Sequence, residues 1–93
     1  MLGNILRGDS MNNEETNLFH LDELNVHKIR KTLNEVIDAL EERGYDSNNQ
    51  IVGYLISGDL GYISSHKDAR KKMQELDRAE VIEVLLREFQ KQK

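Results

Sequence analysis

Apolar side chains recur every three or four positions along two stretches of this chain, with polar and charged residues between them. The first stretch covers about residues 25–43, and its apolar positions are Val26, Ile29, Leu33, Val36, Ile37 and Leu40. The second follows Asp77, and its apolar positions are Val81, Ile82, Leu85, Leu86 and Phe89. Because an α-helix makes one turn about every 3.6 residues, this spacing gathers the apolar side chains on one face. The pattern predicts two amphipathic helices, each burying one face.

The stretch between them, residues 44–70, predicts two shorter helices. One spans about residues 48–57, with apolar positions Ile51, Val52, Leu55 and Ile56. Gly44 before it and Gly58 after it are placed to end helices, since glycine readily takes the left-handed conformation found at helix C-termini. The other spans about residues 66–75, and either Ser64 or Ser65 suits its N-cap.

Capping residues also mark the ends of the long helices. Either Asp22 or Asn25 can cap the first of them, and Asp77 followed by Glu80 has the spacing of a capping box for the last. The predicted fold class is therefore all-α, a compact bundle of about four short helices.

Two small residues lie on one side of the helix predicted over residues 48–57. Gly53 is inside that helix, where glycine costs about 1 kcal/mol relative to alanine. Ser57 follows four residues later, so the two form a flat face that another backbone can approach closely. A packing contact is the simpler interpretation of this face, and the alternative is a partner or dimer interface formed by Ile51, Gly53, Tyr54 and Ser57. The apolar stripes are generous for so short a chain, so we expect a homodimer, in which the first and last helices could each bury more.

Residues 1–21 lack periodicity and predict a flexible tail in front of a helical core over residues 22–93. Asn, Glu, Gly, Ser and Thr dominate from Gly3 to Asn17, a composition typical of mobile segments. Leu18, Phe19 and Leu21 are candidates for a short anchor that folds back onto the core. Met11 is a second candidate start residue, in which case residues 1–10 are an upstream or added extension.

The composition indicates the cellular compartment in which the protein is expected. The chain has 93 residues, no cysteine and a formal net charge of −4. The absence of cysteine excludes disulfides and thiolate metal sites and fits a reducing compartment. No apolar run approaches the roughly 18 residues that a membrane span needs, and the first residues turn polar too soon for a signal peptide. We expect a cytoplasmic protein without membrane insertion.

The sequence shows no arrangement typical of a catalytic centre. His20, His27 and His66 lie in three different segments without ligand spacing, whereas a zinc site needs three or four converging ligands. The carboxylates are scattered along predicted helix surfaces, with no nucleophile beside them. We expect no enzymatic activity, no bound metal and no cofactor.

Lys67, Arg70, Lys71 and Lys72 form a basic patch on the third predicted helix. A helix, a turn and this basic helix faintly resemble a helix-turn-helix DNA reader, although the connection is longer than usual. A nucleic-acid-binding module is the alternative function. A solvated or partner-docking face is the simpler interpretation, because neighbouring acids dilute the patch and the net charge is negative.

Thr16 is the candidate for phosphorylation. The chain has two threonines, and Thr32 belongs to a strongly periodic helix, whereas Thr16 follows Glu14 and Glu15 in the predicted tail. A protein kinase needs its substrate segment in extended form, so a tail threonine is reachable. A phosphate there would add a charge of about −1.5 to −2. It could release the apolar anchor by repulsion or dock on the basic patch; an unmodified threonine is the third possibility.

Several blocks of the central stretch form a recognisable signature, namely Gly44-Tyr45, Asn49 to Tyr54 (NQIVGY), Ser57-Gly58-Asp59, Tyr62-Ile63 and Ala69-Arg70. Together they resemble the signature of the IreB family, small regulatory phosphoproteins of low-GC Gram-positive bacteria. The likeness extends from about Thr16 to Phe89. This chain departs from the family pattern at Asn13, where a second tail threonine is often found, and at Leu60, where proline is usual.

The resemblance implies a small all-helical homodimer without enzymatic activity. It implies a cytoplasmic target of a membrane-anchored serine/threonine kinase that carries extracellular cell-wall-sensing repeats, and of the partner phosphatase. By position, the family's tail phosphothreonine corresponds to Thr16. The implied role is control of cell-envelope stress responses through a downstream protein that the sequence does not identify.

Overall fold

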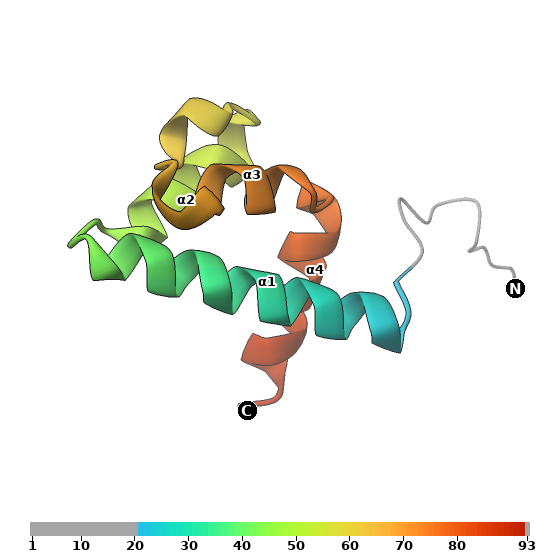
Figure 1. Ribbon diagram of the computed structural model, residues 1–93. Helices are drawn as coiled ribbons and strands as arrows, with labels where there is room; N and C mark the ends of the chain where they lie inside the picture. Colours follow the sequence, from blue (N-terminus) through green and yellow to red (C-terminus); the bar gives the residue numbers. More distant parts are fainter. Residues whose placement is uncertain (1–20, 93) are drawn as a thin grey trace, which may run out of the picture.

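Four α-helices and two short 3-10 helices make up the part of the chain that the computed structural model describes, residues 21–92 (Figure 1). Their bounds are α1 Glu23–Glu42, α2 Ser47–Ser57, η2 Leu60–Tyr62, η3 His66–Asp68, α3 Ala69–Gln74 and α4 Arg78–Gln90. No strand occurs within residues 21–92. The predicted all-α class is confirmed, while Thr16, His20 and nearly all of the predicted tail lie outside the described residues.

The ends of α1 follow the predicted capping pattern. Asp22, one of the two candidates, is the N-cap, and its carboxylate accepts a hydrogen bond of 2.9 Å from the backbone N–H of Asn25. Beyond the other end, Gly44 has a φ of 77° and its N–H donates to the carbonyl of Glu41. A residue with a side chain would be strained in this left-handed conformation.

The start of α2 differs by one residue from the prediction. Asp46 is the N-cap, accepting from the backbone N–H of Asn49 at 3.0 Å. Ser47 is the first helical residue and is buried, and its hydroxyl donates to Glu41 on α1 at 3.1 Å. The helix ends as predicted at Gly58, in the left-handed conformation.

The predicted continuous helix over residues 66–75 is wrong in its first turn. Lys67 and Asp68 have φ values of 49° and 62°, so the short η3 turn is separated from α3 by a kink. Such values cost roughly 1 to 3 kcal/mol per non-glycine residue unless surrounding contacts offset them. Here the side chains of His66 and Lys67 both bond to Glu42 on α1. The kink at Lys67 and Asp68 therefore occurs together with bonds to Glu42, which is distant in sequence. The periodicity of residues 66–75 alone does not predict it.

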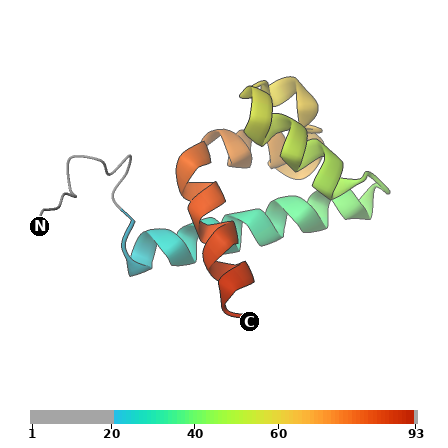
Figure 2. The same cartoon turned by 180° about the vertical axis from the view of Figure 1, so that it is seen from behind.

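The helices are arranged around α1 (Figures 1 and 2). The segment from α2 through α3 lies along one side of α1, with α3 nearer the viewer in Figure 1 and α2 nearer in Figure 2. Helix α4 starts beside α3, crosses α1 and projects beyond it. The core between them consists of Ile29, Leu33, Val36, Ala39, Leu40, Ile51, Tyr54, Ile63, Ala69, Met73, Leu76, Val81 and Val84.

The predicted buried stripe of α4 is only partly buried. Val81 is fully buried, as is Val84 beside it. Four other apolar residues of this helix are 43–63% exposed, namely Ile82, Leu85, Leu86 and Phe89. Because α4 crosses α1 rather than running along it, only one short part of its apolar surface meets the core.

Gly53 is required by a contact within the chain. A Cβ atom at this position would lie 2.5 Å from Cδ1 of Tyr62, which follows α2 in the η2 turn. Such a separation is shorter than real Cβ contacts, so the ring or the backbone would have to move. The group that approaches Gly53 closely is therefore the ring of Tyr62 in the same molecule, and not a second backbone.

We predict that Gly53→Ala destabilises the fold by about 1 to 3 kcal/mol, the usual cost of overpacking. In a Tyr62→Ala background the same substitution should be neutral or stabilising, because alanine is the better helix former by about 1 kcal/mol. Urea denaturation of the four proteins of this cycle measures the coupling. Equal effects of Gly53→Ala in both backgrounds would show that the ring is not the cause.

Candidate functional site

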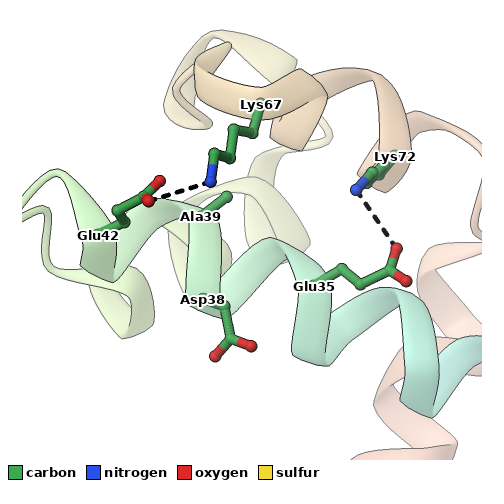
Figure 3. Close-up of a pocket in the computed structure, with 6 residues that line it drawn as sticks. All are labelled: Glu35, Asp38, Ala39, Glu42, Lys67 and Lys72. Carbon is green, nitrogen blue, oxygen red and sulfur yellow. Dashed lines mark hydrogen bonds and ion pairs between the residues drawn. The ribbon is translucent and has the colours of Figure 1, made fainter.

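A charged cleft lies between α1 and the η3–α3 segment (Figure 3). Its volume is ≈ 280 Å³, and it is lined by Glu35, Asp38, Ala39, Glu42, Lys67 and Lys72. The acids come from the solvent side of α1, while the lysines come from η3 and α3. Buried Ala39 packs at the helix surface between them, where a larger side chain would keep the two elements apart.

Two lysine–glutamate pairs cross this cleft. Lys67 Nζ is 3.0 Å from Glu42 Oε2, and Lys72 Nζ is 3.3 Å from Glu35 Oε1. The side chain of Asp38 points away from both pairs (Figure 3). Each pair is solvent-exposed, and such pairs contribute little to stability. They connect the η3–α3 segment to α1.

Glu42 and Glu35 each interact with more than one cation. His66 Nε2 lies 2.8 Å from Glu42 Oε1, and its Nδ1 lies 3.4 Å from a guanidinium nitrogen of Arg43. Hydrogen bonds from His66 and Lys67 lower the pKa of Glu42. A hydrogen bond from Lys72 and the charges of Lys72 and Lys31 lower the pKa of Glu35. Both carboxylates therefore stay ionised at neutral pH.

The predicted basic patch is largely compensated by these contacts. Lys67 and Lys72 are paired with glutamates, and the Arg70 guanidinium donates to the backbone carbonyl of Ile63 at 2.8 Å. Lys71 is exposed and has no ion pair within residues 21–92. A nucleic-acid interface would need a row of cations on one face that contacts several successive phosphates, whereas only Lys71 of this patch makes no ion pair or hydrogen bond within residues 21–92. The arrangement therefore does not favour the nucleic-acid alternative.

The four residues predicted for a dimer interface have partners within the chain. Ile51 and Tyr54 are buried in the core, and Gly53 packs against the Tyr62 ring. The Ser57 hydroxyl donates to the carbonyl of Gly53 at 2.8 Å and accepts from a backbone N–H at 3.0 Å. A dimer contact through these residues stays a prediction, and their exposed neighbours on α2 are better placed for one.

An apolar groove lies where α1, α2 and α4 meet. Its volume is ≈ 120 Å³, and its lining residues are Leu33, Ile37, Asn48, Ile51, Val52, Leu55 and Leu85. Beyond it, Ile56 on α2 and Leu86 on α4 are 80% and 52% exposed. The sequence does contain a signal for this exposed apolar surface, because apolar residues between positions 51 and 56 lie on more than one face of α2. One helix face cannot bury them all.

Neither a metal-binding cluster nor a membrane-spanning helix occurs in the described part of the chain. Within residues 21–92 no group of three or more His, Asp or Glu side chains is placed to hold a metal ion. His27 is exposed, whereas His66 is engaged by Glu42. Among these residues, no helix is both long and apolar enough to span a bilayer.

Comparison with known proteins identifies the family. A family model described as IreB regulatory phosphoprotein matches residues 14–91. The chain belongs to the IreB family. It is also 44% identical over 77 residues to a UPF0297 protein of Acetivibrio thermocellus, covering 83% of this chain and 86% of that protein. IreB membership supports a regulatory role, and the matched region includes Thr16.

We predict that Glu42 contributes to the acid sensitivity of the fold. Its pKa is lower in the folded than in the unfolded chain, so its contribution is present above the unfolded pKa, near 4.5, and is lost as pH falls through the lower folded value. The stability difference between the wild type and Glu42→Gln should therefore shrink between about pH 6 and pH 3.

Urea denaturation at each pH measures this difference. The matched control is Glu75→Gln, which removes an exposed carboxylate that has no ion pair within residues 21–92. A stability difference for Glu42→Gln that is constant across this pH range would contradict the role given to its bonds with His66 and Lys67.

Proposed function

We propose that this IreB-family protein is a non-enzymatic, cytoplasmic regulator whose Thr16 is phosphorylated by a membrane-anchored serine/threonine kinase and dephosphorylated by the partner phosphatase. It acts in cell-envelope stress signalling by binding a downstream protein. The observation that carries the proposal is the family match, which begins at residue 14 and so includes Thr16.

The positions of Thr32 and Ser47 favour Thr16 over these two residues. Thr32 lies in the middle of α1 and is half-buried, and Ser47 is buried at the start of α2. A kinase would have to unwind a packed helix to reach either residue. Thr16 lies in the segment whose composition predicts a flexible tail, so we expect that modifying it requires no unfolding of the core.

We predict that the soluble domain of the cognate kinase phosphorylates Thr16, and that Thr16→Ala abolishes more than nine-tenths of the incorporated phosphate. Thr32→Ala is the matched control and should leave incorporation unchanged. Mass spectrometry of the intact protein and of its peptides measures the stoichiometry and the site. Phosphate found on serines in place of Thr16 would contradict the proposal.

A homodimer is the second part of the proposal. Nine large apolar residues among residues 21–92 are exposed by at least 40%, and six of them belong to α2 and α4, namely Val52, Ile56, Ile82, Leu85, Leu86 and Phe89. Contiguous apolar patches of this kind are typical of protein interfaces. We propose that two copies bury the apolar groove and its α4 border against each other.

We predict that Leu86→Glu converts the dimer to a monomer, with the dissociation constant raised at least about 100-fold, because a buried charge in the interface has no partner. Leu24→Glu is the matched control, since Leu24 is 81% exposed in the first turn of α1 and does not line the groove. Sedimentation velocity over a range of concentrations measures the mass. A dimer that survives Leu86→Glu would rule out this surface.

A further inference from the structure

We propose that Lys28, Lys31 and Lys72 form a phosphate-binding cluster that receives phosphorylated Thr16 of the same chain. This inference rests on the proposed phosphorylation and specifies what the phosphate does. The ligand class is a phosphate monoester on an acidic, extended segment.

The first argument is the excess of positive charge around Glu35. Lys31 Nζ lies 3.5 Å from Glu35 Oε2, and Lys72 Nζ lies 3.3 Å from Glu35 Oε1 (Figure 3 shows the second pair). Two ammonium groups from different helices therefore converge on one carboxylate. The lowered pKa of Glu35 has the same cause. Lys28 lies one turn before Lys31 and has no ion pair within residues 21–92, so three lysines lie at this end of the cleft against two acids, Glu35 and Asp38.

The second argument is that these residues follow one another along a single face of α1. Leu24, Lys28, Lys31 and Glu35 are spaced by four, three and four residues, so they form a continuous row. Leu24 at the start of that row is 81% exposed. The row thus begins with an uncovered apolar side chain and continues with cations.

The third argument is the length of the segment that would cover this row. Thr16 precedes Leu21, where the described chain begins, by five residues, which span about 17 Å when extended. Along α1 the rise is about 1.5 Å per residue, so Lys31 lies about 15 Å from Leu21 and Leu24 about 5 Å. A segment running back along α1 would bring Leu18 and Phe19 to Leu24, and Thr16 to the level of Lys31. Lys72, which bonds to Glu35 about 21 Å along α1 from Leu21, lies about one helical turn further.

The fourth argument is charge complementarity. Glu14 and Glu15 precede Thr16, and a phosphate would add about two further negative charges to this short segment. Lysine ammonium groups bind phosphate through charge-assisted hydrogen bonds. The other lysine–glutamate pair, Lys67 with Glu42, lies about 30 Å along α1 from Leu21 and is beyond the reach of Thr16. That pair provides a matched control at the far end of the same cleft.

The test uses the full chain with phosphothreonine incorporated at position 16 during synthesis, so it does not depend on any kinase. A ³¹P NMR titration measures the second pKa of the phosphate. Docking on lysines favours the dianion, so this pKa should be lower than in a free phosphopeptide of residues 11–21 by about half a unit or more. The double variant Lys31→Gln/Lys72→Gln should restore the peptide value, whereas Lys67→Gln should not.

Each result decides the inference. A phosphate pKa equal to that of the free peptide, or an equal change in Lys67→Gln and in the double variant, overturns the cluster. Far-ultraviolet circular dichroism of both variants shows whether each is folded, and Lys28→Gln, which removes no ion pair within residues 21–92, serves as a second probe of the cluster. Failure of the kinase to modify Thr16 would instead overturn the proposed function and leave this result standing.

Discussion

The apolar face of α1 is the constraint on which the rest of the fold depends. Five of its residues are buried, and α2, α3 and α4 all pack against this helix. Burying one such side chain contributes about 1.5 to 3 kcal/mol, and a domain of this size has few of them. None of the other helices is long enough to be stable alone, since isolated helices under about 12 to 15 residues are marginal in water. Their stability therefore comes from contact with α1 and with one another.

The other two sides of α1 differ in polarity, so the molecule has one charged surface and one apolar surface. On one side, glutamates meet the lysines of η3 and α3 across the charged cleft. On the other, Leu33 and Ile37 border the apolar groove with α2 and α4. These two surfaces are the candidates for contact with other molecules. The apolar groove suits a permanent contact, whereas the exposed ion pairs, which are individually weak, suit a contact that a phosphate can change.

Much of the fold could be predicted from the sequence because its signals are local. The periodicity of α1, the glycines at positions 44 and 58, and the cap at Asp77 depend on neighbouring residues. The kink at Lys67 could not be predicted, because it accompanies bonds to Glu42, twenty-five residues earlier. The exposure of the α4 stripe depends on the angle at which α4 crosses α1, which periodicity does not encode.

The candidate site was less accessible to sequence reasoning than the fold. The basic residues of positions 67–72 were visible as a group, but the glutamates that pair with Lys67 and Lys72 come from another helix. Gly53 was recognised as a position of close approach, although its neighbour, Tyr62, follows it by nine residues. In both cases the residue type indicated that a contact would form. The residue on the other side of the contact could not be predicted, because it depends on the tertiary arrangement.

Screening by salt determines how far a phosphate on Thr16 can act. At physiological ionic strength the Debye length is about 8 Å, so a phosphate influences charges within one or two helix turns and little beyond. The levels of Lys31 and Glu42 on α1 are about 16 Å apart, given the helical rise. If phosphorylated Thr16 docks near Lys31 as we propose, it would compete with Glu35 for Lys31 and Lys72, while the bonds of Lys67 and His66 to Glu42 lie outside its range. The change would then be local to one end of the charged cleft, with the η3 kink and the core retained.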